Sequence, residues 1–375
     1  MRLKKLLQTE SVLCIAAALA LVSMLPVPPD RAYGSYIDWR TLAVLFSLMT
    51  VTAGLRRQGV FARLGRLLLA RTGSAAGLVL ALVGLCFFGS MVITNDVALI
   101  TFVPFTLGVL GALDAGTQRR LIVPTVAMQT LAANLGSMLT PIGNPQNLYL
   151  YARGGLTAGQ LARLMGPYAL LAGAALAVWA LVLTRSGGAA VCVQAPDEPE
   201  ERPDGRRIAL HAALFALCLL AVLRVLPYQA AFFAVLAAAL LFDRPALRLV
   251  DYSLLATFAA LFVFIGNLGR LPVLSGFLSR VLAGREVPVA VAASQVMSNV
   301  PAALLLSGFS DNIPALIVGT DLGGLGTLIA SMASLISYRL LTRARPEEKG
   351  RYFVCFTLSN IALLALELAL WALIG

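Results

Sequence analysis

The stretch that decides the fold is Ala132–Tyr151, which reads AANLGSMLTPIGNPQNLYLY. It lies inside an apolar sequence, yet it combines amide and hydroxyl side chains with two glycines and two prolines. An unpaired backbone group in lipid costs several kcal/mol, so a broken backbone is stable in a membrane only where protein or a wet cavity surrounds it. We therefore predict a discontinuous transmembrane helix, whose polar break is the kind of place at which transporters bind ions and substrates.

The composition of the whole chain agrees with a membrane protein. Of 375 residues, 59% are hydrophobic and 13% are charged, and the mean hydropathy is +0.86, as in polytopic membrane proteins. The net charge of +11 comes from basic residues scattered between apolar blocks, which indicates cytoplasmic loops rather than a nucleic-acid-binding surface. The five cysteines are isolated and His211 is the single histidine, so no disulfide framework or zinc site is expected. We interpret His211 as interfacial.

Apolar blocks and polar breaks divide the chain into five regions. We expect an uncleaved N-terminal span with an outer loop (1–38), a first repeat (39–184), a flexible cytoplasmic linker (185–207), connecting spans (208–249) and a second repeat (250–375). The basic N-terminus is expected in the cytoplasm because positive loops stay inside. The sequence thus predicts a multi-pass protein of the cell membrane (inner or plasma membrane).

Two apolar segments carry a short polar interruption. Thr94-Asn95-Asp96 divides residues 75–113, and Ser298-Asn299 divides residues 287–318. Basic residues flank both ends of the first segment, so we expect both ends on one side of the membrane and the polar triplet at the tip of a re-entrant hairpin. Two ordinary spans joined by a short outer turn are the alternative.

The two halves repeat the same features. Asp38-Trp39 and Asp251-Tyr252 each open a span, and an amphipathic segment follows each of these spans. When 132–151 is aligned with 319–338, six of twenty positions are identical: Leu135/Leu322, Gly136/Gly323, Thr140/Thr327, Ile142/Ile329, Leu148/Leu335 and Tyr151/Tyr338. An odd number of predicted spans lies between the hairpins, so they enter from opposite faces. The predicted fold is an all-α polytopic membrane protein, an inverted-repeat transporter with two re-entrant hairpins and two discontinuous helices.

The hairpin tips and helix breaks offer complementary chemistry. Helix N-termini carry free N–H donors and partial positive charge that favour anions, and we expect such donors from Val97 to Ile100 and from Ala302 to Leu304. The breaks offer carbonyls and amides that suit Na⁺. The expected substrate-binding residues are Thr94, Asn95, Asn144, Asn147, Ser298, Asn299, Ser331 and Ser334. The expected ion-coupling residues are Asp96, Asp321, Asn134, Gly143, Thr140 and Thr327.

Asp96 and Asp321 are the intramembrane carboxylates with the clearest functional meaning, because an acid in lipid is costly and usually functional. Either can carry a proton or bind a sodium ion. Asp96 has a second reading, in which it caps the helix that follows it; capping and coupling are compatible.

These motifs resemble those of the ion transporter superfamily, which includes arsenite permeases, related sodium/proton antiporters, and citrate or dicarboxylate carriers. The resemblance is carried by 94–100 (TNDVALI), 142–147 (IGNPQN), 298–302 (SNVPA) and 319–323 (GTDLG). It implies a homodimer with a scaffold part and a moving part that contains both hairpins and works as an elevator. The chain departs from the dicarboxylate branch, since Asp96 replaces a Thr and Val300-Pro301 follows the second Ser-Asn. Asn95-Asp96 at the first tip and Thr320-Asp321-Leu322-Gly323 in the second half are more similar to the arsenite-permease branch.

The sequence therefore predicts an ion-coupled secondary transporter of a small anion, a carboxylate or an oxyanion such as arsenite. Na⁺ or H⁺ is the expected coupling ion, and no cofactor is expected. A sodium/proton antiporter and a passive anion channel remain as alternatives. A membrane enzyme is disfavoured, because the sequence shows no nucleophile–base pair, metal cluster or phosphate loop.

Overall fold

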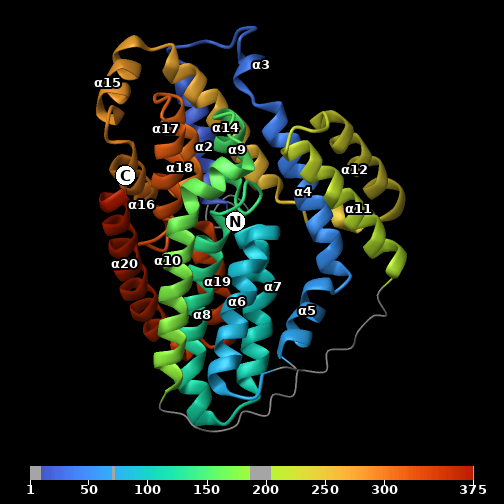
Figure 1. Cartoon of the computed structure of the whole chain (residues 1–375). Helices are drawn as coiled ribbons and strands as arrows, with labels where there is room; N and C mark the ends of the chain where they lie inside the picture. Colours follow the sequence, from blue (N-terminus) through green and yellow to red (C-terminus); the bar gives the residue numbers. More distant parts are fainter. Residues whose placement is uncertain (1–9, 70–71, 186–203, 375) are drawn as a thin grey trace.

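The computed structural model describes residues 10–69, 72–185 and 204–374, and these fold into helices joined by short turns (Figure 1). The first repeat contains α4 (Trp39–Arg57), α5 (Val60–Leu69), α6 (Ala75–Val92), α7 (Asn95–Gly111), α8 (Ala115–Ser137), α9 (Pro145–Arg153) and α10 (Ala158–Thr184). The second contains α14 (Tyr252–Gly269), α15 (Pro272–Leu282), α16 (Glu286–Met297), α17 (Asn299–Ser307), α18 (Ile313–Leu322), α19 (Met332–Ala344), the 3₁₀ turn η1 (Pro346–Glu348) and α20 (Lys349–Ile374). The remaining helices are α2 (Ser11–Ser23), α3 (Tyr33–Tyr36), α11 (Gly205–Val222), α12 (Tyr228–Phe242) and α13 (Arg244–Leu247).

The two repeats place equivalent helices at opposite ends of the molecule. In the view of Figure 1, the hairpin α6–α7 and the short helix α5 lie in the lower half, and the hairpin α16–α17 and the short helix α15 lie in the upper half. The half-helices α8 and α19 point down from the centre, and α9 and α18 lie above it. The all-α polytopic fold is confirmed, and the relative placement of the two repeats agrees with an inverted pair. Within the described residues, five helices are long and apolar enough to cross a membrane: α6, α10, α11, α14 and η1–α20.

The predicted break in the first repeat separates α8 from α9. Helix α9 begins at Pro145, which needs no N–H partner at the first helical position. The Asn144 side chain caps it by accepting the backbone N–H of Asn147 at 2.8 Å. Gly143 closes the break tightly, because a Cβ there would lie 2.1 Å from the Ser137 carbonyl oxygen. The amides and glycines of this stretch therefore shape the break itself.

The first helix of each repeat begins in the same way. The side chain of Asp38 accepts the N–H of Thr41 at 3.1 Å, and that of Asp251 accepts the N–H of Leu254 at 2.9 Å. Each carboxylate satisfies an orphan donor and lies at the positive end of the helix dipole. These caps confirm the alignment of Asp38 with Asp251. The amphipathic segment predicted after the first span, at 56–71, starts later as α5 at Val60, because α4 continues to Arg57 and the chain turns at Gly59 with a φ of 68°.

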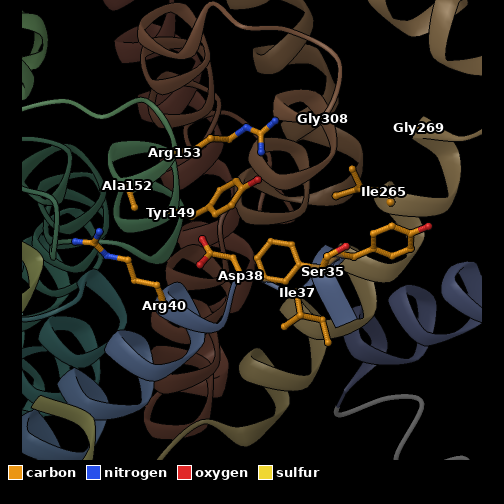
Figure 2. A pocket seen from close by; sticks show the side chains of 13 residues that line it. Ser35, Ile37, Asp38, Arg40, Tyr149, Ala152, Arg153, Ile265, Gly269 and Gly308 are labelled. Atoms are coloured by element: carbon orange, nitrogen blue, oxygen red, sulfur yellow. The ribbon is translucent and has the colours of Figure 1, made fainter. Parts of the chain in front are cut away.

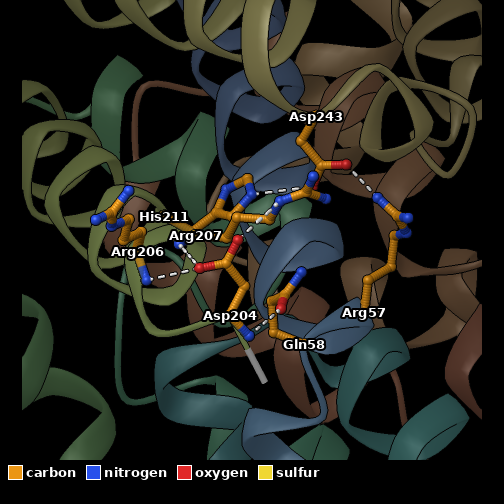
Figure 3. Close-up of polar contacts among 7 residues, drawn as sticks. All are labelled: Arg57, Gln58, Asp204, Arg206, Arg207, His211 and Asp243. Atoms are coloured by element: carbon orange, nitrogen blue, oxygen red, sulfur yellow. Dashed lines mark hydrogen bonds and ion pairs between the residues drawn. The ribbon is translucent and has the colours of Figure 1, made fainter. Parts of the chain in front are cut away.

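The interfacial position of His211 stays a prediction, and the structure adds a buried contact to it. His211 is buried in α11, and its Nε2 lies 3.0 Å from a carboxylate oxygen of Asp243 (Figure 3). The other oxygen of Asp243 pairs with Arg57 at the end of α4. Gly54 makes room for the imidazole, since a Cβ there would lie 2.2 Å from the ring. The histidine thus fastens α11 and α12 to α4, a tertiary role that its place at the start of an apolar run did not reveal.

The predicted linker at 185–207 lies almost wholly outside the described residues. Its described end, Asp204, caps α11 and donates its N–H to the side-chain oxygen of Gln58 at 3.3 Å. The predicted five-region division stays a prediction.

Candidate functional site

Each hairpin tip is tied to the helix break of its own repeat by an equivalent backbone hydrogen bond. The N–H of Asn95 donates to the carbonyl of Gly143 at 2.9 Å, and the N–H of Asn299 donates to the carbonyl of Ala330 at 2.9 Å. Asn95 aligns with Asn299, and Gly143 aligns with Ala330 in the repeat register given above. Equivalent tips therefore contact equivalent breaks, so the repeat is present in the contacts as well as in the sequence.

Two further contacts repeat one turn before the tips. The Thr140 hydroxyl donates to the Met91 carbonyl at 2.6 Å, and the Thr327 hydroxyl donates to the Gln295 carbonyl at 3.3 Å. Both threonines thus bind the hairpin backbone, and neither is fully buried.

Close packing between hairpin and broken helix depends on an equivalent pair of glycines. A Cβ on Gly136 would lie 2.1 Å from the Phe87 carbonyl oxygen and 2.8 Å from the Ser90 hydroxyl. A Cβ on Gly323 would lie 2.5 Å from the Ser294 hydroxyl. Each hairpin therefore rests directly on the backbone of its broken helix.

Side chains of the two repeats meet at the centre of the molecule. Asn134, near the end of α8, accepts from Asn95 Nδ2 at 3.2 Å and from Ser331 Oγ at 3.0 Å. Its own Nδ2 donates to Ser334 Oγ at 3.4 Å. Thus one amide connects the first hairpin tip to the break of the second repeat, and all four residues are buried.

Asp321, which aligns with Asn134, makes the reciprocal connection. Its Oδ1 accepts from Asn144 Nδ2 at 3.0 Å and from Gln146 Nε2 at 3.4 Å, so residues of the first break hold the half-helix of the second repeat. Its Oδ2 is buried and has no hydrogen-bond partner among the described residues. We call Asn95, Asn134, Asn144, Gln146, Asp321, Ser331 and Ser334 the central network. It contains amides, hydroxyls and one carboxylate, and its members include no basic side chain.

The two tips differ for a reason visible in the sequence. Thr94 caps α7, with its hydroxyl 3.5 Å from the N–H of Val97. Ser298 cannot cap α17 in this way, because the residue three positions later is Pro301, which has no N–H. Ser298 instead has a φ of 73° and turns its hydroxyl to 3.4 Å from the Ala330 carbonyl. A positive φ on a non-glycine residue costs roughly 1–3 kcal/mol and is typical of functional sites.

The reading of Asp96 as a helix cap is wrong. Helix α7 begins at Asn95, Thr94 is its N-cap, and Asp96 lies within the first turn. Not all of the backbone N–H groups expected to be free at the first hairpin tip are free. The N–H of Ala98 donates to the Thr94 carbonyl at 2.9 Å. The buried Oδ1 of Asp96 has no hydrogen-bond partner within the described part of the chain. The backbone N–H of Asp96 donates to Oδ1 of Asn95, a member of the central network, at 2.9 Å.

The other predicted residues shape the surroundings of the network. Asn147 donates its N–H to the Asn144 side chain and its Nδ2 to the Met138 carbonyl at 3.1 Å, so it braces the break. Asn299 lies against Gly324, where a Cβ would meet Asn299 Nδ2 at 2.9 Å. Gly143 supplies the carbonyl that accepts from the first tip.

Sequence reasoning missed two amides. Gln146 belongs to the quoted motif but was not assigned to the site, although it donates to Asp321. Gln295 fills the second break: its Nε2 donates to the carbonyls of Gly323 at 3.0 Å and Leu325 at 2.9 Å, and its Oε1 accepts from the N–H of Thr327 at 2.9 Å. The sequence did contain a signal for Gln295, since it is a lone amide one turn before the predicted hairpin tip.

Two cavities lie between the first helix of a repeat and the second half of its broken helix. The α9 vestibule has a volume of about 550 Å³ and lies between the start of α4 and the end of α9 (Figure 2). The α19 vestibule has a volume of about 70 Å³ and lies between the start of α14 and helix α19, where it reaches Ser298. Repeat-equivalent Asp38 and Asp251 line one each. The α9 vestibule is therefore much the larger of these two cavities.

Broken helices, hairpins and a shared polar centre in an apolar helical protein define a multi-pass membrane transporter, not an enzyme. The particular family is the citrate transporter family (CitMHS), whose model matches residues 5–335, and the chain belongs to it. This result also confirms the resemblance to the ion transporter superfamily.

The chain is also similar to two proteins along most of their length and to a third over a shorter segment. The chain is 33% identical over 343 residues to the inner membrane protein YbiR of Escherichia coli K12, covering 89% of this chain and 88% of that protein. It is 30% identical over 306 residues to the transporter MJ0456 of Methanocaldococcus jannaschii, covering 81% of each. It is 32% identical over 137 residues to the rice silicon efflux transporter LSI3, covering 36% of this chain and 27% of that protein.

Proposed function

We propose that this protein is an ion-coupled secondary active transporter of a small anion, a carboxylate or an oxyanion such as arsenite, and that it works by elevator-type alternating access. The observation that carries the proposal is the central network, in which each repeat's broken helix is held by residues of the other repeat. Such a centre, with a wide cavity toward one end and a narrow one toward the other, suits a site that is exposed to the two sides in turn.

The moving part in this proposal consists of the hairpins and broken helices. Their backbone bonds and glycine contacts are short and repeated in both halves, so we expect these elements to travel together. The scaffold consists of α4, α14 and the α11–α13 unit that His211 fastens to α4. The vestibules lie between these two parts, which is where relative motion opens and closes a path.

The coupling ion is placed at Asp321 in this proposal. The partnerless Oδ2 of Asp321 offers a place for a proton or for one ligand of a sodium ion, and the amide and hydroxyl oxygens nearby are the oxygen ligands that hard cations take. Occupation by either cation lowers the net negative charge of the network. An anionic solute then enters the centre more readily, which couples its movement to that of the cation.

A sodium/proton antiporter is the second candidate. It is favoured by one observation: the central network contains a carboxylate and, as the structure describes it, no basic side chain to balance an anion. In that case the proton and the sodium ion compete for Asp321, and no organic or inorganic anion is carried.

Uptake into proteoliposomes separates these functions. Citrate, succinate, arsenite and sulfate are tested as solutes, with proton and sodium gradients imposed separately. Accumulation above equilibrium with one gradient supports coupled anion transport. Sodium release driven by a proton gradient without anion flux supports the antiporter, and anion flux that ignores both gradients identifies a passive channel.

We further propose a homodimer in the inner or plasma membrane with a cytoplasmic N-terminus. On this topology the turn after α17 faces outward, so Ser310→Cys is expected to react with an impermeant maleimide added outside intact cells. Reaction only after the cytoplasmic side is opened would invert the topology.

A further inference from the structure

We propose that the α9 vestibule is an anion-binding antechamber, in which Arg40 and Arg153 hold a small dicarboxylate or tetrahedral oxyanion before it reaches the central network. This inference rests on the proposed anion transport and adds a second binding site to it. The site is the larger of the two vestibules and shares no residue with the central network.

The two arginines approach the cavity from different elements. Arg40 lies in the first turn of α4 and Arg153 ends α9, and both line the cavity together with Asp38 and Tyr149 (Figure 2). An arginine in each of two parts that move relative to one another suits capture of a solute between them. The guanidinium fork matches a carboxylate or a tetrahedral oxyanion in bidentate fashion.

The arginines that line the α9 vestibule keep N–H donors that a ligand can use. Asp38, the acidic residue of the lining, is already engaged, because its oxygens accept from the N–H and the hydroxyl of Thr41 at 3.1 Å and 2.6 Å. Arg40 uses one donor on the Ala221 carbonyl at 3.2 Å. A guanidinium has five N–H donors, so most of them stay available.

A third arginine removes an obstacle to anion binding. The carbonyl end of α9 would repel an anion through the negative end of the helix dipole. Arg224 donates to the carbonyls of Tyr151 at 3.4 Å and Ala152 at 3.0 Å, immediately before Arg153. The positive charge of Arg224 therefore offsets the negative potential of these carbonyls beside the antechamber.

The α19 vestibule lacks this balance. It is lined by Arg339 together with Glu10 and Asp251, so its acids outnumber its bases, whereas in the α9 vestibule the bases outnumber the acid. The two vestibules therefore lie at equivalent places in the repeats but have linings of opposite net charge. We infer that anions are collected at the α9 end and that the opposite end favours their departure.

A barrier separates the antechamber from the central network. Tyr149 follows Asn147 on α9 by two residues, and its hydroxyl lies 3.0 Å from Ser307 Oγ on the second hairpin. Its ring packs on Phe262 of the scaffold helix α14, with 5.6 Å between ring centroids. A solute held by the arginines thus waits outside a closed aromatic contact, which makes the antechamber a distinct site.

The test compares Arg40→Gln, Arg153→Gln and the double variant with wild type. Arg163→Gln removes the same charge from an exposed position of α10 outside the vestibule and is the matched control. Sulfate, succinate and citrate are the probes, in titrations of the purified protein and in uptake from each face of oriented proteoliposomes. Loss of one charge-assisted contact corresponds to about a tenfold change in half-saturation.

We expect each single variant to raise the half-saturation concentration about tenfold for anions added at the α9 face, with the maximal rate and the opposite face unchanged. Arg40→Lys and Arg153→Lys keep the charge and are expected to recover part of the affinity, which shows that the fold is intact. Wild-type half-saturation in the double variant, or an equal loss in Arg163→Gln, overturns the antechamber alone. Absence of anion transport by the wild-type protein overturns the proposed function as well.

Discussion

Replacement of Gly136 by alanine tests whether hairpin and broken helix form one rigid unit. The added Cβ would lie 2.1 Å from the Phe87 carbonyl oxygen, whereas ordinary contacts begin at 3.4 Å. The obstacle is backbone within α6, which cannot rotate away, so the hairpin must retreat by about 1 Å. Overpacking of this kind costs about 1–3 kcal/mol, and we expect the upper end of that range.

Two other glycines calibrate the effect. At Gly323 a Cβ would lie 2.5 Å from the Ser294 hydroxyl and 2.7 Å from the Gly319 carbonyl oxygen, both farther than the 2.1 Å at Gly136, so Gly323→Ala is expected to cost less. Gly84 lies in the same helix as Phe87, and a Cβ there meets only Phe88 at 3.9 Å. Because alanine is the better helix former, Gly84→Ala is expected to stabilise the protein by about 0.5–1 kcal/mol.

Thermal unfolding in detergent, followed by tryptophan fluorescence, measures the relative stabilities of these glycine variants. With about 2 °C per kcal/mol, Gly136→Ala is expected to melt about 6 °C below wild type and Gly84→Ala at or slightly above it. We also expect Gly136→Ala to lose transport, since its hairpin carries Asn95 away from Asn134. Melting of Gly136→Ala at the temperature of Gly84→Ala would refute the tight contact.

Other predictions concern acidic residues. Asp96→Asn is expected to abolish gradient-driven flux in proteoliposomes while size-exclusion profiles stay unchanged; unaltered flux would remove Asp96 from the mechanism. Hydrogen bonds from the Thr117 side chain and N–H lower the pKa of Asp114, the cap of α8. Its stabilising contribution is therefore present above the ordinary aspartate pKa and lost as pH falls through the lowered value. Asp114→Asn should cap equally well but remove this acid-side dependence in melts at successive pH values. Asp243→Asn is expected to lower the stability by about 3 kcal/mol, because it weakens the buried link to His211; an unchanged melting temperature would contradict that role.

The elements of the fold were predictable because their signals are local. A proline after a polar cap starts α9, aspartate starts α4 and α14, and a polar pair interrupts each hairpin. The repeat register was predictable for the same reason, since it needs only the order of residues within each half. Contacts along one helix or one turn leave a pattern in the sequence.

Contacts between the halves left no such pattern. The register aligns Asn134 with Asp321, but it does not reveal that each is held by the break of the other repeat, about 200 residues away in the chain. The orientation of the Asp96 side chain could not be predicted from the sequence either. The sequence reading that made Asp96 a cap began the helix two residues late. Two residues correspond to more than half a helical turn, so the expected orientation of the Asp96 side chain was wrong, and the residue expected as a cap lies in the first turn.

The most direct test of the account compares Asp321→Asn with Asp311→Asn in gradient-driven uptake. Both variants remove one carboxylate from the second repeat, but Asp311 is exposed before α18, whereas Asp321 is buried in the central network. The account predicts that Asp321→Asn stays folded and no longer accumulates solute against its gradient, while Asp311→Asn behaves as wild type. Full accumulation by Asp321→Asn, with an unchanged response to proton and sodium gradients, would contradict it.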